Sequence, residues 1–416
     1  MATRVMVQKV RREMLYATES LQPKRNTEQV TADAADVFRM IADNMRRWEA
    51  DPDRIAHFLT KLVFCLFAED VSLLPVGPKG ETGIFSEIIE RTRTNTAQFQ
   101  KYMHELFEAM ADGGEMMFAE IPYFNGSLFD DVNVGELSLE AMTALEKAAQ
   151  LNWEAIEQSI FGTLFERSLD PNKRSQLGAH YTSREDILLI VEPVLMQPLR
   201  RQWDDIQLKA EPIREKYDQA DNKRAQTTAM NQLLGLREAI LHELRTITVL
   251  DPACGSGNFL YVSLQLLMDM EKEVINHPLW QGLQRPIPEV HPRQMYGIEV
   301  NPIAHALASI VVWIGYIQWR NNNGYGQAFK EPILEALQDN IVCMDAILAF
   351  DDEGNPTEPE WQAVDVIVGN PPFLGGYRQR SELGDEYVER LHTTFKGKII
   401  ASADLVMYWF EKARKQ

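Results

Sequence analysis

The chain has 416 residues, of which 45% are hydrophobic and 25% are charged, and it carries a net charge of −19. This length suggests two or three domains, and no apolar run approaches the ~20 residues that a membrane-spanning helix needs. The acidic balance argues against broad, nonspecific attraction to nucleic acid, because contact with phosphates depends on clustered lysine and arginine, so any DNA-binding surface must be local.

The cysteines and the N-terminus indicate which metal sites, disulfides and cellular location to expect. Cys65, Cys254 and Cys343 are too few and too scattered for a disulfide framework or a zinc cluster. Each lies in an apolar segment, so we expect three small core residues and no metal site. The segment from Met1 to Glu19 is charged and does not resemble a signal peptide. We therefore expect a cytoplasmic protein that contacts no membrane.

The N-terminal third is expected to form an α-helical domain, residues 31–165, behind a polar extension, residues 1–30. The clearest helix starts at Asp51-Pro52, an N-cap followed by a first-turn proline. Apolar residues then recur at three- and four-residue intervals and form one buried stripe. The stripe comprises Ile55, Phe58, Leu59, Leu62, Val63, Leu66 and Phe67. Further helices are expected at 85–93, 99–111, 139–150 and 153–167.

Two more helical regions follow a short string with a central tyrosine. Residues 177–183 read L-G-A-H-Y-T-S, and a helix is expected directly after them, over residues 184–196. Residues 202–245 are rich in charge and in good helix formers, which predicts one or two long helices with a solvated face.

The segment from Ile247 to Leu260 predicts a buried strand, a glycine turn and a helix. Its first residues are apolar or β-branched, and Asp251 ends the strand. Gly255 and Gly257 follow with one residue between them. A backbone without Cβ can take positive φ and let a ligand approach closely, and the first N–H groups of the next helix are free to bind it.

Two further strands are each expected to end in a carboxylate. The strand over residues 295–300 carries Glu299, at the place where a Rossmann-like second strand bonds ribose hydroxyls. The proline-rich loop 277–292 accounts for the long spacing from the glycine turn, and an apolar helix is expected over 303–319. The strand over 340–344 ends in Asp345, which could instead act as the N-cap of a short helix.

Three strings together resemble the S-adenosylmethionine-dependent amino-methyltransferases that act on DNA. Residues 251–259, D-P-A-C-G-S-G-N-F, resemble motif I, and residues 177–183 resemble motif X. A fourth expected strand, residues 364–368, runs into N-P-P-F at 370–373, which resembles motif IV. The order of the motifs fits the γ arrangement. The resemblance implies an α/β Rossmann-like methyltransferase core, preceded here by the α-helical domain.

The resemblance also implies which residues form the site. In this family the carboxylate after the third strand commonly accepts a hydrogen bond from the adenine amino group of the cofactor, which is S-adenosyl-L-methionine. The expected cofactor-binding residues are Tyr181, Thr182, Asp251, Ala253, Gly255, Gly257, Asn258, Phe259, Glu299, Asp345 and Asn370. The expected catalytic residues are Asn370, Pro371, Pro372 and Phe373. We expect the glycine turn and the N-P-P-F loop to open side by side at one rim of a parallel sheet.

The chemistry of an exocyclic amine explains the residue types in the N-P-P-F string. The lone pair of an aromatic amine is delocalised into the ring, so the amine is a poor nucleophile. The Asn370 side-chain oxygen and the Pro371 carbonyl can accept hydrogen bonds from the amine as positive charge forms on its nitrogen. The prolines hold both acceptors in place. Phe373 offers a stacking face, worth roughly 1–3 kcal/mol, to a base that has left the duplex. Methyl transfer is then direct, with no covalent enzyme intermediate and no metal.

Further strings narrow the resemblance to the adenine methyltransferases of type IIL restriction-modification enzymes and the related phage-defence (DISARM) methylases. These strings lie at 161–167, 374–376, 382–387 and 403–411, and the region around Asp404 resembles motif V. Family members continue into a target-recognition domain. We therefore expect the methyltransferase domain, residues 166–416, to be C-terminally incomplete, with no target-recognition domain. One alternative is that a second polypeptide supplies that domain.

The resulting hypothesis is a DNA methyltransferase that acts on adenine N6 of double-stranded DNA, in restriction-modification or phage defence. Cytosine N4 stays open as the target atom. Two alternatives also stay open. One is an amino-methyltransferase of RNA or of protein glutamine, since both use the same N-P-P hydrogen bonding. The other is a scaffold that binds the cofactor but is catalytically silent.

Overall fold

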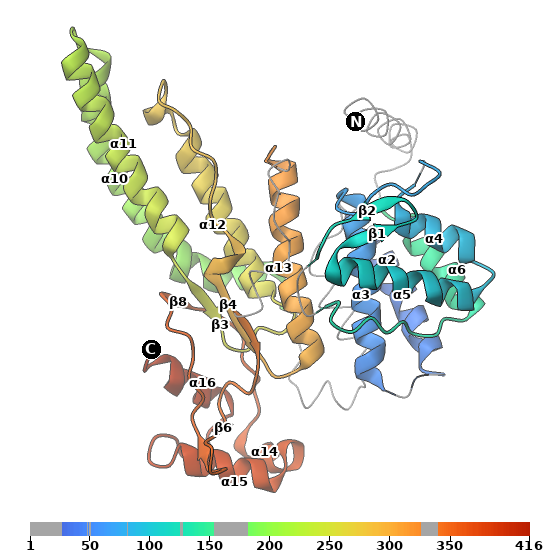
Figure 1. The fold of residues 1–416 in the computed structure, drawn as a ribbon. Helices are drawn as coiled ribbons and strands as arrows, with labels where there is room; N and C mark the ends of the chain where they lie inside the picture. Colours follow the sequence, from blue (N-terminus) through green and yellow to red (C-terminus); the bar gives the residue numbers. More distant parts are fainter. Residues whose placement is uncertain are drawn as a thin grey trace. The chain divides into compact units, whose positions relative to one another are not determined.

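The computed structural model describes residues 27–47, 49, 51–80, 82–124, 128–153, 182–325 and 340–416. These residues fall into two compact units, one ending at residue 153 and the other beginning at residue 182 (Figure 1). The strings at 161–167 and 177–181, including Tyr181, lie outside the described residues, as does nearly all of the helix expected at 153–167.

The first unit is mainly helical, and the expected helices are present in its described part. The apolar stripe that begins at Ile55 is buried as predicted. Helix α2 begins at Thr27, inside the stretch expected to be a polar extension. The elements are α2 (Thr27–Met45), α3 (Pro52–Asp70), α4 (Ile84–Thr92), α5 (Thr96–Asp112), β1 (Gly114–Met116), β2 (Ala119–Ile121) and α6 (Leu139–Ala148).

The hairpin of β1 and β2 was not predicted from the sequence. Its two strands pair in antiparallel fashion, with Glu115 opposite Glu120. The turn between them is made by Met117 and Phe118, whose φ angles are 50° and 65°. Tight hairpin turns are normally marked by Asn-Gly or Asp-Gly, so this one carries no sequence signal. The core of this unit is aromatic: the Phe64 ring lies 5.7 Å from the Phe129 ring, edge to face.

The second unit begins with helices that lead into a long antiparallel pair. Helix α9 (Arg184–Val191) passes through a π-helical turn (Glu192–Met196), in which the Gln197 N–H bonds to the Glu192 carbonyl. Pro193 lies in this turn and has no N–H to donate. Helices α10 (Gln197–Asp218) and α11 (Lys223–Thr246) then pack along each other and extend beyond the sheet (Figure 1). The prediction of long helices in this region is confirmed.

The described residues of the second unit are centred on a parallel sheet of four strands, in the order β5-β4-β3-β8. All four expected strands are present. Val249 of β3 lies opposite Met295 of β4 on one side and Val366 of β8 on the other. The strands are β3 (Val249–Asp251), β4 (Met295–Glu299), β5 (Ile341–Cys343) and β8 (Val366–Ile367). Cys343 is exposed at the end of the edge strand β5, so its expected place in the core was wrong, while Cys65 and Cys254 are buried.

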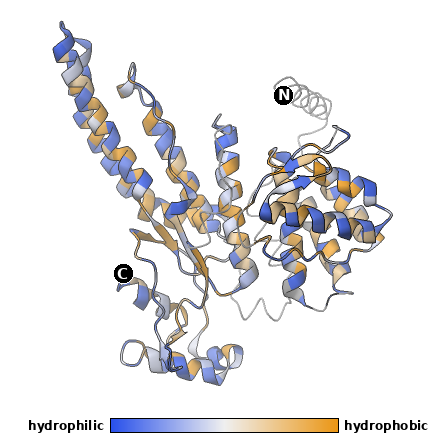
Figure 2. Cartoon of the chain, viewed as in Figure 1, coloured by the Kyte–Doolittle hydropathy of each residue, from blue (hydrophilic) through white to orange (hydrophobic). Residues whose placement is uncertain are grey.

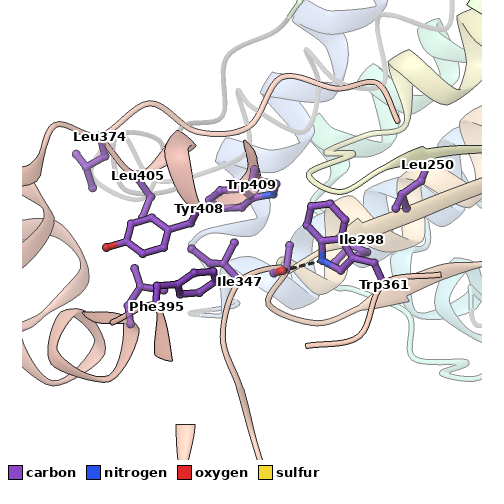
Figure 3. Packing of buried hydrophobic residues seen from close by; sticks show 11 residues of the cluster. Leu250, Ile298, Ile347, Trp361, Leu374, Phe395, Leu405, Tyr408 and Trp409 are labelled. Atoms are coloured by element: carbon purple, nitrogen blue, oxygen red, sulfur yellow. Dashed lines mark hydrogen bonds between the residues drawn. The ribbon is translucent and has the colours of Figure 1, made fainter. Parts of the chain in front are cut away.

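Helices cover both faces of the sheet. Helices α12 (Asn258–Asn276) and α13 (Pro302–Asn322) pack against the strands on one side. The strand side chains Leu250 and Ile298 point to the other side, into a buried cluster with residues of the C-terminal helices (Figure 3). These are α14 (Gly376–Leu383), α15 (Asp385–Thr394) and α16 (Val406–Ala413), next to a hairpin of β6 (Ala349–Phe350) and β7 (Pro356–Thr357).

The hydropathy of the chain follows this layered arrangement. The sheet strands are predominantly hydrophobic, whereas the far end of the α10–α11 pair is predominantly hydrophilic (Figure 2). Among the described residues, no helix combines the length and the apolarity that crossing a bilayer requires.

Candidate cofactor and catalytic site

The two strings expected to form the site follow neighbouring strands. Strand β3 pairs in parallel with β8, with Leu250 opposite Ile367, and the Val368 N–H donates to the Leu250 carbonyl (2.9 Å). Parallel neighbours end at the same edge of a sheet, which is where doubly wound folds bind ligands. The expectation that the glycine turn and the N-P-P-F loop open at one rim is therefore confirmed.

The glycine turn has the left-handed backbone that its two glycines permit. Gly255 has φ = 54° and Gly257 has φ = 83°. The Gly257 N–H donates to the Cys254 carbonyl (2.8 Å), and the Cys254 N–H donates to the Ile298 carbonyl of β4 (3.0 Å). The turn is thus anchored to the next strand and ends directly at the start of α12.

The two glycines have different surroundings. A Cβ at Gly257 would lie 3.0 Å from both the Cα and the carbonyl oxygen of Ala308 in α13, whereas a Cβ at Gly255 would meet no atom of the described residues within 4 Å. Gly257 therefore allows α13 to approach the turn. Gly255 leaves its side of the turn open, as close approach by a ligand would require.

Glu299, at the end of β4, braces this turn. One carboxylate oxygen accepts the Gly255 N–H (2.9 Å), and the other accepts the Asn301 N–H (2.7 Å). Burial raises the pKa of Glu299 above its ordinary value, and the backbone hydrogen bonds oppose that rise. Each carboxylate oxygen has two lone pairs, so the carboxylate can still accept further hydrogen bonds from a ligand.

Asp251 is the most deeply buried acid of the site, with 1% of its surface exposed. Its Oδ1 accepts the Ala253 N–H (3.0 Å), while its buried Oδ2 has no hydrogen-bond partner in the described chain. Burial, reinforced by the charge of Glu299, raises the pKa of Asp251 to about 7. A Cβ at Gly369 would lie 2.3 Å from Asp251 Oδ1, so the strand end that leads into the N-P-P-F loop rests against this carboxyl.

Asp345 follows β5 and shapes the turn in which it lies. Its Oδ1 accepts the N–H groups of Ile347 (2.8 Å) and Leu348 (3.1 Å), and its Oδ2 accepts the hydroxyl of Tyr387 (2.7 Å). Asp345 therefore makes the hydrogen bonds of a helix N-cap, although the short helix that it could have capped is not formed. Its expected contact with a cofactor adenine remains a prediction.

The N-P-P-F loop is held at its first residue by a side chain far away in the sequence. The Asn370 Nδ2–H donates to Thr182 Oγ1 (3.2 Å). Thr182 belongs to the string that resembles motif X, and Asn370 to the string that resembles motif IV. The structure thus brings together two of the three strings on which the site prediction depends.

The other end of the loop is held by the residues before α16. The Leu374 N–H donates to Asp404 Oδ1 (3.0 Å), and the Leu405 N–H donates to the Leu374 carbonyl (3.0 Å). Phe373 is 70% exposed between these anchors, so its ring is available for stacking. Pro371 and Pro372 are partly exposed.

The remaining predicted residues lie around the glycine turn. The N–H of Ala253 is used by Asp251, and Phe259 is buried. Asn258 is the first residue of α12, and its buried Oδ1 has no hydrogen-bond partner within the described residues. Tyr181 is outside them. In the described part of the chain, no three His, Cys, Asp or Glu side chains cluster closely enough to hold a metal ion.

Several residues that shape the site were missed by the sequence analysis. The Trp409 Nε1–H donates to the Pro252 carbonyl in the glycine turn (2.9 Å). The Gln379 amide donates to the carbonyls of Leu374 (3.0 Å) and Ala403 (2.9 Å), behind the N-P-P-F loop. These contacts join residues brought together by the fold, so no local pattern could have predicted them.

A parallel sheet covered on both faces, with a glycine turn and an N-P-P-F loop at one edge, fits the Rossmann-like core of a methyltransferase. Residues 220–416 match the family described as "MmeI, DNA-methyltransferase domain". Residues 53–129 match the family described as "MmeI, helicase spacer domain". Residues 220–416 are therefore similar to a DNA-methyltransferase domain of the MmeI type, and residues 53–129 of the first unit are similar to its spacer domain.

Three known proteins illustrate the similarity. "DNA methyltransferase A" of Bacillus subtilis (strain 168) is 27% identical over 364 residues, 85% of this chain and 37% of that protein. A putative type II restriction enzyme and methyltransferase of Methanocaldococcus jannaschii is 25% identical over 356 residues, 73% of this chain and 28% of that protein. The type IIL restriction-modification enzyme MmeI, solved in complex with DNA, has the same fold with a TM-score of 0.68, at 24% identity, over 94% of this chain and 48% of that one. The chain thus spans about a third of the length of these two curated relatives.

Proposed function

We propose that this chain is an S-adenosyl-L-methionine-dependent DNA methyltransferase that transfers a methyl group to adenine N6 of a base extruded from double-stranded DNA. The observation that carries the proposal is the meeting of Thr182, Asp251 and Asn370 at the edge where β3 and β8 end. We place the activity in restriction-modification or phage defence, in the cytoplasm. We propose that residues 31–165 form the helical domain and that residues 166–416 form the catalytic domain.

The residues around the glycine turn fit the proposed cofactor. Two buried polar atoms without a partner among the described residues, Asp251 Oδ2 and Asn258 Oδ1, are groups that a polar ligand or its bound water would satisfy. No described residue fills the space beside Gly255, and the helix N-terminus that follows provides N–H donors. Glu299 would accept the ribose hydroxyls, and Asp345 the adenine amino group. When bound, the cofactor supplies an electrophilic methyl group on its sulfonium.

The role of the N-P-P-F loop follows from its anchoring. The Asn370 side-chain oxygen and the Pro371 carbonyl would each accept a hydrogen bond from the target amine, so that the nitrogen lone pair points at the methyl group. Phe373 would stack on the extruded base. The contacts of Thr182 and Asp404 at the two ends of the loop limit its movement, which preorganises both acceptors.

The test combines cofactor binding with transfer of a tritiated methyl group. Purified chain is titrated with S-adenosylmethionine by calorimetry and then offered labelled cofactor with duplex DNA, RNA and a protein lysate in parallel. We expect saturable binding and label in DNA at adenine. Asn370→Ala should abolish the label, while its cofactor binding should be weakened by the lost Asn370 contact but remain saturable through the residues of the glycine turn.

Other outcomes would contradict the proposal in distinguishable ways. Label in RNA or protein rather than DNA would assign a different substrate class, and label at cytosine N4 would change the target atom. Binding without transfer to any polymer would favour the silent scaffold. A folded chain that binds no cofactor would remove the basis of the proposal.

A further inference from the structure

The contact between Thr182 and Asn370 has a chemical consequence for the direction of the Asn370 side chain. In the described part of the chain, Thr182 Oγ1 is the hydrogen-bond partner of the Asn370 amide, at 3.2 Å from Nδ2. The backbone before Asn370 is fixed separately, because Gly369 rests against the Asp251 carboxyl. The side chain is exposed, so without Thr182 its amide would rotate in solvent.

An amide has one acceptor end and one donor end, and the two ends point in opposite directions. A target amine can only donate its hydrogens, so it needs the Oδ1 end facing it. In that orientation Nδ2 faces the other way and requires an acceptor. The hydroxyl oxygen of Thr182 is an acceptor in the required position, so one hydroxyl both holds the side chain and completes its hydrogen bonding.

The hydrogen bond also affects charge in the reaction. As the amine nitrogen forms its bond to carbon, its hydrogens become more acidic and draw electron density from Oδ1. A donor–acceptor chain from amine to Asn370 to Thr182 becomes stronger in that state, because hydrogen bonds in series polarise one another. The contribution therefore falls on the rate of transfer rather than on DNA binding.

From this geometry we infer that Thr182 is a positioning residue for transfer, which acts through the Asn370 amide rather than by touching the target base. The inference rests on the proposed function and deepens it. It gives Thr182 a role distinct from the cofactor contact that the motif resemblance implies. It also couples the segment that leads into α9 to the N-P-P-F loop.

The test measures single-turnover transfer to duplex DNA at saturating cofactor, with cofactor affinity determined separately. Thr182→Val keeps the shape but removes the hydroxyl. We expect the single-turnover rate of transfer to fall roughly tenfold, with the half-saturating DNA concentration unchanged. Thr182→Ser should restore most of the rate. The matched control is Ser183→Ala, which removes the neighbouring hydroxyl that caps α9 through the Asp186 N–H (3.2 Å) and does not contact Asn370.

A second background shows whether the effect passes through Asn370. In Asn370→Ser the side chain keeps a hydroxyl acceptor but is too short to reach Thr182, so adding Thr182→Val should slow transfer no further. Selective ¹⁵N-asparagine labelling gives a readout besides activity. The side-chain NH₂ signal absent from Asn370→Ser should move towards that of a free amide in Thr182→Val and stay in place in Ser183→Ala.

The results separate this inference from the proposed function. A wild-type chain that methylates no DNA contradicts the proposed function, and the NH₂ signal still tests the contact. An active wild type with an equally fast Thr182→Val variant overturns the inference, as does an equal slowing in the Asn370→Ser background. Equal loss in the serine and valine variants would also overturn it.

Discussion

Gly255 and Gly257 share left-handed backbone geometry, yet they are expected to respond differently to the same substitution. An alanine at either position costs about 1–2 kcal/mol for its positive φ. Gly257→Ala also drives a methyl group into the backbone of Ala308, which adds about 1–3 kcal/mol. Denaturant unfolding should therefore show Gly257→Ala to be the less stable variant.

Gly255→Ala should lose cofactor affinity instead, because its methyl group would occupy the open side of the turn. Each glycine thus serves as the control for the other. Equal stabilities and equal affinities in the two variants would contradict the assignment of Gly257 to helix packing and Gly255 to ligand approach.

Asp251 makes the stability of the fold depend on pH. Its pKa is about 7 in the folded chain and near its ordinary value of 3.8 in the unfolded chain. At pH values between these two pKa values, the folded state binds more protons than the unfolded state. The free energy of unfolding therefore falls as pH rises, and it stops falling above pH 7. From pH 5 to pH 8 the loss spans two pKa units, about 3 kcal/mol.

Asp251→Asn has no proton to lose in this range, so its free energy of unfolding should depend less on pH than that of the wild type. Urea denaturation of both proteins at pH 5 and pH 8 measures the difference. The change with pH is the readout, because the buried amide adds a constant cost at every pH. Parallel pH profiles for the two proteins would show that Asp251 does not titrate as its burial implies.

At the scale of elements, helix α16 is joined to the glycine turn by one side chain. The Trp409 indole donates to the Pro252 carbonyl, and a similar bond joins the Trp361 indole to the Ala346 carbonyl (2.8 Å) in the same buried cluster (Figure 3). Replacing either tryptophan with phenylalanine leaves a buried carbonyl unpaired and should cost about 1–3 kcal/mol of stability.

Trp409→Phe should weaken cofactor binding more than Trp361→Phe. Pro252 belongs to the glycine turn itself, whereas Ala346 follows Asp345, whose carboxylate is also held by the Ile347 and Leu348 N–H groups and the Tyr387 hydroxyl. Calorimetric titration of the two variants makes the comparison at matched stability. If Trp361→Phe lowers affinity as much as Trp409→Phe, the effect is one of general loosening and α16 has no particular role at the turn.

The elements that the sequence predicted are those with a local pattern. The stripe of α3, the strand before Asp251 and the glycine turn each show their structure within about a dozen residues. The β1–β2 hairpin was missed because its turn residues, Met117 and Phe118, are not turn formers. At the site, the anchors of Leu374 and Pro252 depend on Asp404 and Trp409, whose partners are set by the path of the chain rather than by neighbouring residues.

At the scale of the whole molecule, each unit has a core built from its own residues. The first contains buried aromatic rings such as Phe64, Phe107 and Phe129, and the second contains the sheet with the cluster around Leu250. A unit with its own core has the capacity to unfold cooperatively by itself. Calorimetry of the full chain should therefore resolve two thermal transitions.

The two transitions can be assigned by one substitution in each core and by the proposed cofactor. Leu145→Ala, at a fully buried position in α6, should lower the first unit's transition, and Gly257→Ala should lower the second's. S-Adenosylmethionine should raise the temperature of only the transition that Gly257→Ala lowers, because a ligand stabilises the unit that binds it. At a hundredfold excess over Kd, the free energy of unfolding of that unit should increase by about 2.7 kcal/mol. Adenosine at the same concentration is the control for nonspecific effects. A single transition lowered by both substitutions would show that the two cores unfold as one. If S-adenosylmethionine raised only the transition that Leu145→Ala lowers, the cofactor would bind the first unit, which would contradict the proposed site.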